Sequence, residues 1–332
     1  MAPALLIPDS PSDGEQQTTY QPESKRTTVY MIDKLHPAAM KHAQTLFNVV
    51  LPTDPEIQNW KANAEFVLMR GSSLSAADID EAPRLRAVGK QGVGIDKIDA
   101  EACERRNIAI LNTPGVNATA VAELVLALTM SVARQIGSIH LELSRGGVLP
   151  KENCSGLILT GKTLGLLGMG NIGKAVARIF RGAFGAEIVA YDPYMPADAW
   201  EDIPHTRAAT VAEVLVAADV LSIHVPLTAG TRDLISYKEM TTMKSTSIII
   251  NAARGGIVNE ADLATAVSEG LIWGAGLDCH EEEPPTKATY EKLWSSGRIV
   301  STPHIGAATA QTQMETAKAA VDRLYEFSRQ RA

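Results

Sequence analysis

Thr163–Asp192 reads TLGLLGMGNIGKAVARIFRGAFGAEIVAYD, and this stretch decides the fold of the chain. Its first apolar run, Leu164–Leu167, has the character of a strand. Three glycines with the spacing G-x-G-x-x-G follow, namely Gly168, Gly170 and Gly173. Apolar residues at helical spacing come next, and a second apolar run ends at Asp192, about twenty residues past the last glycine. Strand, glycine turn, helix, strand and acid in this order are the fingerprint of a dinucleotide-binding unit.

Each part of the fingerprint has a physical task. Gly168 permits a tight turn, Gly170 lets the backbone approach a pyrophosphate, and Gly173 lets the helix pack closely on the strand. The helix N-terminus presents unpaired N–H groups and a positive dipole end to the phosphates. Asp192 can accept hydrogen bonds from ribose hydroxyls and would repel a 2′-phosphate, so we expect NAD as the cofactor. The alternative is a glycine turn with only a structural task.

The composition is typical of a globular protein with about two domains. The chain has 332 residues, of which 45% are hydrophobic and 21% charged, and its net charge is −7. There is no basic run beyond Lys25–Arg26, so we expect no nucleic-acid partner. Three widely spaced cysteines are expected to be reduced thiols, namely Cys103, Cys154 and Cys279. No stretch resembles a signal peptide or a membrane span, so we expect a cytoplasmic protein without a membrane partner.

Strands alternate with helices, which predicts an α/β fold with two doubly wound parallel sheets of the Rossmann type. Residues 1–27 are rich in Ser, Thr, Pro and Gln and are expected to form a mobile tail. The expected strands are Thr28–Ile32, Val49–Leu51, Phe66–Met69, Leu85–Val88, Ile108–Leu111, Leu164–Leu167, Ile188–Ala190, Val220–His224, Ile248–Asn251, Trp273–Asp278 and Ile299–Ser301. Outside the fingerprint, the expected helices are Pro37–Phe47, Ser75–Glu81, Asp99–Arg106, Ala118–Ile139, Val214–Ala218, Glu260–Glu269 and Ala307–Ala332.

Two of these helices bear on the domain organisation. Ala118–Ile139 is apolar on nearly every face, whereas a surface helix has one apolar stripe. We therefore expect this helix to be buried, either between the layers of a domain or in a contact between subunits. The last helix, Ala307–Ala332, is expected to return to the first half of the chain, which would make that domain discontinuous.

Polar residues at the ends of the expected strands are candidates for chemistry, because ligands of open α/β sheets bind outside the carboxyl ends of the strands. These candidates are Arg70, the glycine-rich turn Gly89–Gly94, Arg254, Asp278 and His304, with Glu283 a few residues past one strand. Each also has a structural interpretation when it is taken alone. Arg254 would then face solvent, and Glu283 would belong to a solvated acidic run.

Together, three of these residues have the properties that reduction of a 2-oxo acid requires. Arg254 offers a fixed, bidentate cation for a carboxylate and a carbonyl oxygen. Hydride delivery to the carbonyl carbon also requires a proton donor to the oxygen. Histidine is the residue type suited to that task near neutral pH, which makes His304 the candidate. A carboxylate such as Glu283 beside the histidine stabilises the imidazolium and orients the ring.

Several ordered motifs closely resemble the D-isomer-specific 2-hydroxyacid dehydrogenase family, especially its phosphoglycerate dehydrogenase-like branch. The resemblance runs from about Thr28 to the C-terminus. The motifs that carry it are Gly89–Asp99 (GKQGVGIDKID), Asn112–Glu123 (NTPGVNATAVAE), Gly168–Gly173, His224–Thr228 (HVPLT), Asn251–Glu260 (NAARGGIVNE), Gly276–Pro284 (GLDCHEEEP) and Thr302–Ala307 (TPHIGA).

The resemblance implies a role for each site residue. Arg254 would bind the substrate and polarise its carbonyl, His304 would be the acid in reduction and the base in oxidation, and Glu283 would be its partner. Asp278 would bond the nicotinamide carboxamide. The remaining cofactor contacts would come from Asn171, Ile172, Val225, Pro226, Ala252 and Ala253. Substrate contacts beyond Arg254 would come from Val93 and Gly94, and from Arg70 at the far end of the substrate.

The resemblance also implies a homodimer and two lobes that close over a cleft. The substrate-binding domain would comprise residues 28–117 and 305–332, and the NAD-binding domain residues 118–304. Cys279–His280 departs from the family, which usually has two apolar residues there, but we expect no metal because no second pair has ligand spacing. The substrate stays open between phosphoglycerate, glyoxylate or hydroxypyruvate and branched 2-oxo acids. The alternative function is an NAD(H)-sensing dimeric scaffold, like the corepressors with this fold.

Overall fold

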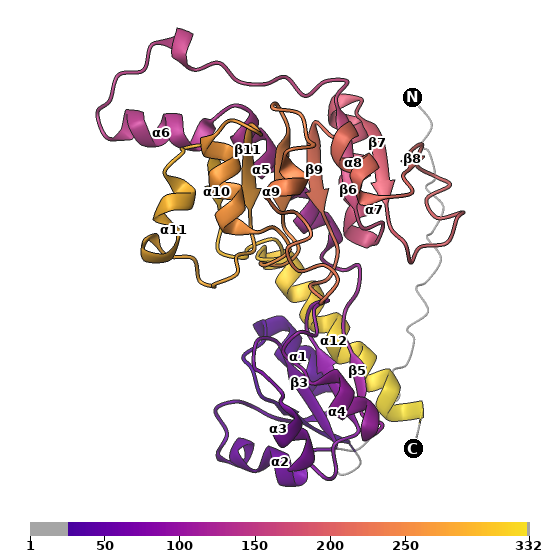
Figure 1. Cartoon of the computed structure of the whole chain (residues 1–332). Helices are drawn as coiled ribbons and strands as arrows, with labels where there is room; N and C mark the ends of the chain where they lie inside the picture. Colours follow the sequence, from indigo (N-terminus) through magenta and orange to yellow (C-terminus); the bar gives the residue numbers. More distant parts are fainter. Residues whose placement is uncertain (1–25, 331–332) are drawn as a thin grey trace, which may run out of the picture.

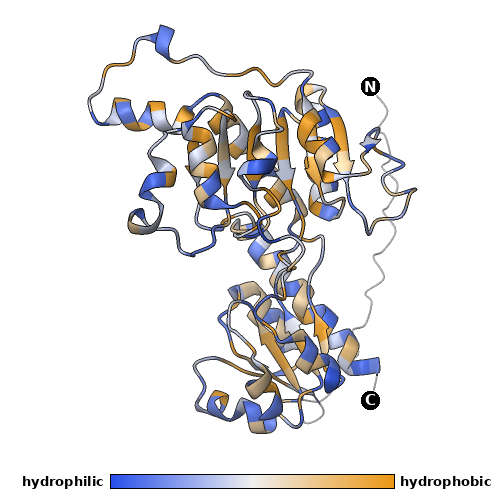
Figure 2. Ribbon diagram, viewed as in Figure 1, coloured by the Kyte–Doolittle hydropathy of each residue, from blue (hydrophilic) through white to orange (hydrophobic). Residues whose placement is uncertain are grey.

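The computed structural model describes residues 26–330, which form two α/β lobes (Figure 1). The expected mobile tail, residues 1–27, lies outside the described residues except for its last two positions. Figure 2 shows hydrophobic residues concentrated in the strands of both lobes. Every strand pairing in the described chain is parallel, as the alternation of strands and helices predicts.

The first lobe contains a five-stranded parallel sheet with the order β2-β1-β3-β4-β5. Its strands are β1 (Thr28–Met31), β2 (Asn48–Val50), β3 (Phe66–Met69), β4 (Ala87–Lys90) and β5 (Ala109–Leu111). Its helical segments are α1 (Pro37–Leu46), η2 (Pro55–Asn59), α2 (Trp60–Asn63), α3 (Ala76–Asp80), α4 (Ala100–Arg105) and, from the far end of the chain, α12 (Ala310–Gln330). The strand order reverses between β1 and β3, which places a binding crevice at their carboxyl ends.

Alternating side chains of the first sheet pack on two different helical layers. Val29, Phe66 and Leu68 contact α1 and α12 on one face. Val67 and Val88 contact α3 and α4 on the other. The packing of α12 on α1 and β4 confirms that the first lobe is discontinuous in sequence. Its small buried residues, such as Ala317 and Ala320, let this long helix approach the sheet closely.

The second lobe contains a seven-stranded parallel sheet with the order β12-β11-β10-β9-β6-β7-β8. Its strands are β6 (Thr163–Leu167), β7 (Glu187–Tyr191), β8 (Thr206–Arg207), β9 (Val220–Ile223), β10 (Ile248–Asn251), β11 (Gly274–Leu277) and β12 (Ile299–Ser301). Its helical segments are α5 (Ala118–Ala133), α6 (Ile136–Ser144), η3 (Lys151–Asn153), α7 (Asn171–Phe184), α8 (Val211–Ala217), α9 (Tyr237–Met240), α10 (Glu260–Ser268) and α11 (Lys287–Trp294). The order reverses between β6 and β9, the switch point of a dinucleotide-binding sheet.

Helices cover both faces of the second sheet. α5 and α7 pack together on one face, where Leu164, Leu166 and Ile250 are buried. Side chains of α8, α9, α10 and α11 cover the other face, where Leu221 and Ile249 are buried. The strands β9, β10 and β11 are therefore buried along their whole length, which explains why their sequences are mostly apolar.

The helix expected over Ala118–Ile139 is wrong as a single element, because it breaks into α5 and α6 with a bend of 64°. Gln135 adopts a left-handed backbone conformation (φ 52°) at the break, and its side-chain amide donates to the Ser155 carbonyl (3.1 Å). The expected burial applies to α5, of whose 16 residues eight are buried under the sheet and against α7. No residue of α6 is buried.

Other departures from the expected elements are small. β4 extends to Lys90, so the expected turn Gly89–Gly94 begins two residues later, at Gln91. The short elements α2, α9, α11, η2, η3 and β8 had no counterpart in the sequence-based prediction. Most of them are two to five residues long, too short for hydrophobic periodicity to indicate them.

Among residues 26–330, we find no single helix whose length and apolar character would suffice to cross a membrane. The bent pair α5–α6 meets that criterion of length and composition only when its two helices are taken together.

Candidate active site

The glycine turn after β6 has the geometry that a dinucleotide site requires. Gly168 has a φ of 99°, and a Cβ built there would lie 2.5 Å from the carbonyl oxygen of His224. Any larger residue would therefore collide with the backbone just past the neighbouring strand β9. Gly170 precedes the first residue of α7, Asn171, and a Cβ built on Gly170 meets no atom within 4 Å. This open space in front of a helix N-terminus fits a pyrophosphate.

Asp192 lies at the end of β7, beside the glycine turn. Its carboxylate accepts hydrogen bonds from the backbone N–H groups of Met169 and Tyr194, both at 2.9 Å. The neighbouring cation, Arg207, donates to the backbone carbonyl oxygens of Asp192, Met195 and Pro196. The guanidinium of Arg207 is therefore bound by the loop that follows β7 and does not pair with the carboxylate of Asp192.

His224, at the end of β9, is a feature of this edge that the sequence analysis did not single out. Its Nε2 is 2.8 Å from the Ser222 hydroxyl, and its Nδ1 is buried without a partner in the described part of the chain. Burial lowers the pKa of His224 to about 3, so the ring is neutral at physiological pH. His224 begins the motif HVPLT. Of the two residues that follow it, Val225 is half-buried and Pro226 is exposed.

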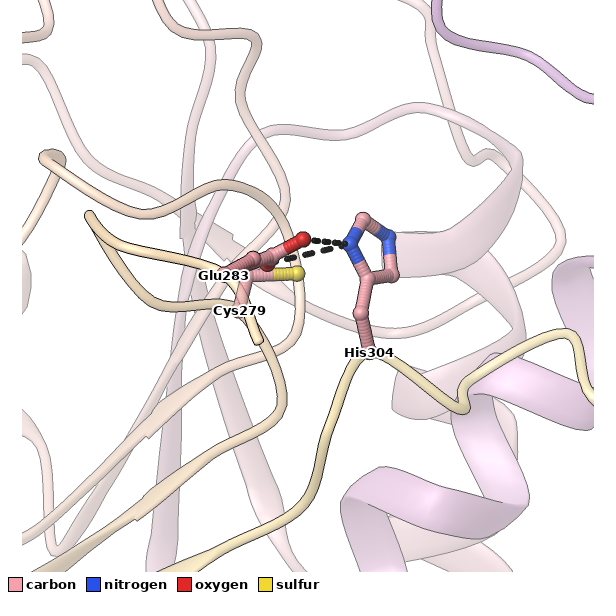
Figure 3. A group of neighbouring side chains, drawn as sticks. All are labelled: Cys279, Glu283 and His304. Atoms are coloured by element: carbon pink, nitrogen blue, oxygen red, sulfur yellow. Dashed lines mark hydrogen bonds and ion pairs between the residues drawn. The ribbon is translucent and has the colours of Figure 1, made fainter. Parts of the chain in front are cut away.

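His304 and Glu283 form a pair on the rim of the second lobe (Figure 3). The Nδ1 atom of His304 lies 3.0 and 3.1 Å from the two carboxylate oxygens of Glu283. The side chains are 44% and 36% exposed, so solvent and small molecules reach both groups. The structure therefore brings together the histidine and the acid that the sequence analysis paired.

Asp278 fixes the loop that carries His304. This aspartate is 1% exposed, and its carboxylate accepts hydrogen bonds from the Thr302 hydroxyl (2.6 Å) and from the N–H groups of Ile305 and Gly306 (both 2.8 Å). The N–H of His304 donates to the backbone carbonyl oxygen of Asp278 (2.7 Å), and His304 has a φ of 57°. A left-handed histidine costs free energy, and these bonds offset that cost.

Arg254 lies in the turn after β10 and contacts the first lobe. Its Nε and a terminal nitrogen are both 2.9 Å from the same carboxylate oxygen of Asp96, and another terminal nitrogen donates to the Ala253 carbonyl oxygen (2.7 Å). Asn251 shapes the turn, because its side chain bonds the carbonyl of Arg254 and the N–H of Ala253. Asp96 belongs to the GKQGVGIDKID motif, but the sequence analysis gave it no role.

Gly94 leaves room for the arginine. A Cβ built on Gly94 would lie 1.8 Å from a terminal nitrogen of Arg254, so any side chain there would displace the guanidinium. The neighbouring Val93 is 38% exposed, and its carbonyl oxygen accepts a hydrogen bond from the Asn112 amide (2.7 Å). The glycine turn of the first lobe therefore lies directly against Arg254.

Arg70 follows β3 and stands at the crevice of the first lobe. The carboxylate of Asp33, which follows β1, accepts hydrogen bonds from the N–H groups of Arg70, Gly71 and Ser72 and from the Ser72 hydroxyl, at 2.6–3.0 Å. Burial acts to raise the pKa of Asp33, but the bonds from Ser72, Arg70 and Gly71 outweigh it and lower that pKa. Arg70 also lines a cavity of about 350 Å³ together with Lys34 and His36.

Lys90 is a buried cation beside this crevice. It is 7% exposed, and its Nζ donates to the carbonyl oxygens of Arg70 (2.5 Å) and Gln91 (2.9 Å). Burial lowers the pKa of the Lys90 ammonium. The hydrogen bond from Lys90 therefore fixes the backbone at Arg70.

Cys279 and His280 contact different surroundings. His280 is 3% exposed and bonds the Ser301 hydroxyl through Nε2 (2.9 Å), with its ring against Tyr290. Cys279, in contrast, faces the pair of Glu283 and His304 (Figure 3). Its Sγ donates to the Ala253 carbonyl oxygen (3.4 Å), which also accepts from Arg254. The shared acceptor places Arg254 and the pair of Glu283 and His304 around one site.

The profile described as D-isomer specific 2-hydroxyacid dehydrogenase, NAD binding domain, matches residues 126–306, more than half of the chain. The chain belongs to the D-isomer-specific 2-hydroxyacid dehydrogenase family. It is 39% identical over 263 residues to a hydroxypyruvate reductase of Thermotoga maritima, a match that covers 79% of this chain and 84% of the relative. As a 2-hydroxyacid dehydrogenase, the chain is an oxidoreductase with a domain for a nicotinamide cofactor.

Two further proteins are similar to this 2-hydroxyacid dehydrogenase. A D-3-phosphoglycerate dehydrogenase of Methanocaldococcus jannaschii is 35% identical over 289 residues, 86% of this chain but only 54% of the relative, so the chain spans about half the length of that protein. The crystal structure of an NADPH-dependent glyoxylate/hydroxypyruvate reductase from Sinorhizobium meliloti superposes with a TM-score of 0.77 at 28% identity. That match covers 90% of this chain and 93% of the other.

Proposed function

We propose that the protein transfers a hydride between NAD and a D-2-hydroxy acid or the corresponding 2-oxo acid. One observation carries this proposal. A hydrogen-bonded pair of His304 and Glu283 and the guanidinium of Arg254 lie around one site, joined through Cys279 and the carbonyl of Ala253. A proton donor and a cation for a carboxylate are the groups that this reaction needs.

In the proposed mechanism, Arg254 binds the carboxylate of the acid and polarises its carbonyl oxygen. The bond between Nδ1 of His304 and Glu283 leaves Nε2 to give a proton to the carbonyl oxygen in reduction and to take one from the hydroxyl in oxidation. Glu283 stabilises the imidazolium and orients the ring. Asp278 keeps the His304 loop in place. The nicotinamide, when bound, supplies or accepts the hydride.

The residues that would bind the cofactor lie along the carboxyl edge of β6, β7, β9, β10 and β11. Gly168, Gly170, Asn171, Ile172 and Gly173 would face the pyrophosphate, and Asp192 the adenosine ribose. Val225, Pro226, Ala252 and Ala253 would line the nicotinamide half, and Asp278 would approach its carboxamide. The Asp192 carboxylate supports NAD over NADP, because it would repel a 2′-phosphate and the nearby Arg207 is engaged by three carbonyl groups.

The first lobe supplies the proposed substrate-binding domain, residues 28–117 and 305–332, and residues 118–304 the NAD-binding domain. Val93 and Gly94 would present N–H groups to the substrate carboxylate. Arg70 would contact the far end of the substrate. The cavity that Arg70 shares with Lys34 and His36 supports an acid with a second anionic group, such as a phosphorylated or dicarboxylic one.

The experiment that tests this function is an assay of NADH and NADPH oxidation over a panel of 2-oxo acids, repeated in the direction of hydroxy-acid oxidation. We expect turnover with at least one acid and a preference of at least about tenfold for NADH, equivalent to about 1.4 kcal/mol. The panel contains glyoxylate, hydroxypyruvate, its phosphate ester and a branched 2-oxo acid. Failure of every acid, together with dimerisation that depends on NADH, would favour a cofactor-sensing scaffold instead. A preference for NADPH would refute the role given to Asp192.

We also propose that the protein is a cytoplasmic homodimer in which α6 and the segment after it contact the partner subunit. Large apolar side chains are exposed there, namely Ile136 (54%), Leu141 (47%), Leu143 (52%), Val148 (88%) and Ile158 (74%). In Figure 1 this segment projects from the second lobe, away from the first. Several large exposed apolar side chains in one segment are typical of a subunit interface. The free thiols Cys103, Cys154 and Cys279 are compatible with the cytoplasm.

A double substitution of Leu141→Glu and Leu143→Glu is expected to convert the dimer into a monomer, because it introduces two charges into an apolar interface. Sedimentation velocity measures the mass of the variant and of the wild type at equal concentration. Val216→Glu is the matched control, since Val216 is 59% exposed on α8. A monomeric wild type, or a double variant that stays dimeric, would contradict the proposed interface.

A further inference from the structure

Three side chains that differ in chemistry converge at the proposed proton-transfer pair. The Sγ of Cys279, a carboxylate oxygen of Glu283 and a ring nitrogen of His304 all lie within 4.8 Å of one another (Figure 3). Sulfur, oxygen and nitrogen ligands in such a group are typical of sites for zinc and similar divalent cations. No metal was expected from the sequence because no second pair of residues has ligand spacing along the chain, whereas these three ligands come from two separate loops.

The distances within the group require little movement. Zinc bonds nitrogen and oxygen at about 2.0–2.1 Å, which in a tetrahedral site separates the two ligand atoms by roughly 3.3 Å. The Nδ1 of His304 is 3.0 and 3.1 Å from the oxygens of Glu283, so a cation between them needs an opening of a few tenths of an ångström. The bond to sulfur is about 2.3 Å, which separates sulfur from the other ligand atoms by roughly 3.6 Å. Because the three atoms lie within 4.8 Å of one another, Cys279 has to approach by roughly 1.2 Å at most.

The position of the three ligands allows entry from solvent. Glu283 and His304 are exposed, and Cys279 lies buried beneath them. Among the described residues, the only hydrogen bond that the thiol gives up when it turns to a metal is the weak one to the carbonyl oxygen of Ala253 (3.4 Å). Burial, together with the carboxylates of Asp278, Glu283 and Asp96, raises the pKa of the Cys279 thiol, and the guanidinium of Arg254 opposes this shift. A metal ion therefore has to displace the thiol proton when it binds. The local excess of negative charge favours a cation.

We propose that Cys279, Glu283 and His304 bind a thiophilic divalent cation of the zinc class, and that this cation switches off proton transfer. The metal takes the lone pair of Nδ1 on His304, a carboxylate oxygen and the thiolate of Cys279. The thiol proton leaves to solvent. A water molecule or the carboxylate of a substrate completes the four ligands.

Inhibition by the bound metal follows from the chemistry of the His304 imidazole. This part of the proposal rests on the function proposed above. With the metal on Nδ1, the ring keeps its proton on Nε2 but is no longer an imidazolium. Loss of that proton would create an imidazolate, so the ring no longer serves as an acid near neutral pH. The metal also replaces the hydrogen bond between Glu283 and Nδ1 of His304. Binding of the metal, in contrast, does not depend on the reaction that the protein performs.

The test of binding uses the full chain, freed of metals with EDTA, and titrated with Co²⁺ and then with Zn²⁺. We expect one ion per chain and a near-ultraviolet sulfur-to-cobalt charge-transfer band that zinc displaces. Cys279→Val, an apolar residue as in the family, should abolish the band. It should also weaken zinc binding by more than the roughly 10–100-fold that loss of an outer-shell partner costs. Cys154→Val is the matched control and should behave as wild type, because Cys154 lies outside the group.

The outcomes separate the parts of the proposal. A wild-type protein without the band, or a band and zinc affinity unchanged in Cys279→Val, would overturn the site. Cys279→Ser, which keeps the size of the side chain, replaces the valine variant if circular dichroism shows that the latter is misfolded. In the dehydrogenase assay, zinc should inhibit the wild type reversibly, and inhibit Cys279→Val less, each relative to its own rate without zinc. Binding without inhibition of an active wild type would overturn the switch, and absence of turnover in every assay would instead concern the proposed function.

Discussion

Replacement of His304 by alanine is expected to lower kcat by about 10²–10⁴-fold, the usual contribution of a positioned general acid or base. The Kd for NADH should change little, because the proposed cofactor residues lie along other strand ends. The loop geometry should also persist, since Asp278 bonds the backbone of Ile305 and Gly306 and not the imidazole. Steady-state kinetics on the best substrate of the panel, with NADH binding followed by fluorescence titration, measure both quantities.

Two further variants test whether the fall in kcat is specific to His304 and its partner. Glu283→Gln keeps a hydrogen-bond acceptor for Nδ1 but removes the charge that stabilises the imidazolium, so its kcat should fall less than that of His304→Ala. His42→Ala is the control. His42 pairs with Asp322 in the first lobe (2.5 Å), and its loss should leave kcat near the wild-type value. A His304→Ala protein with a wild-type rate would exclude histidine as the proton donor.

Replacement of Arg254 by alanine is expected to lower kcat/KM by roughly 10²–10⁴-fold, because charge-assisted bonds of about 3–5 kcal/mol are lost. The effect should appear in both parameters, since the guanidinium is proposed to bind the carboxylate and to polarise the carbonyl oxygen. Arg254→Lys should recover only part of the loss, because an ammonium lacks the planar, bidentate geometry. The Kd for NADH again serves as the measure of an intact cofactor site.

A substitution of Asp96 should have a smaller effect on kcat/KM than the loss of Arg254. Its carboxylate bonds two nitrogens of Arg254 from across the lobes, and the pair is partly exposed. Asp96→Asn should therefore reduce kcat/KM by only about five- to tenfold, through poorer orientation of the guanidinium. Arg178→Ala, which removes a surface ion pair with Asp202, is the control. If Arg254→Ala and Arg178→Ala had equal kinetics, Arg254 would have no part in substrate binding.

Much of the fold follows from local patterns in the sequence. Phe66–Met69, Ile248–Asn251 and Ile299–Ser301 are strands at the expected bounds, because uninterrupted apolar runs between polar turns fit a parallel sheet buried on both faces. The long apolar segment from Ala118 shows the limit of this reasoning. Its composition predicted burial but not the bend at Gln135, which depends on one left-handed residue and its bond to Ser155.

Some residues of the candidate site could be predicted from the sequence and others could not. Arg254, Glu283 and His304 were predicted because each follows a strand and belongs to a motif. Asp33 and Asp96 were not, because their importance lies in contacts with Arg70 and Arg254, from which they are separated by 37 and 158 residues. An aspartate in a loop has no local pattern that distinguishes a solvated carboxylate from one that fixes a neighbouring backbone.

Cys279–His280 illustrates why adjacent residues do not predict a shared site. The two side chains, which follow β11, have different neighbours. His280 becomes part of the core with Ser301 and Tyr290, and Cys279 faces Glu283 and His304. The direction in which each side chain points depends on the packing of α11 and β12 around the loop.

The sequence by itself determined the dinucleotide-binding unit, the alternation of strands and helices, and the residue types available for chemistry. These are local properties, because glycine at Gly168 and apolar periodicity in the strands are required wherever such a unit forms. Only the tertiary structure decided which loops meet. It joined Asp96 to Arg254 across the lobes, brought Cys279 to His304, and placed α12 back on the first sheet. Strand order and loop conformation set those contacts, and both depend on the packing of the whole chain.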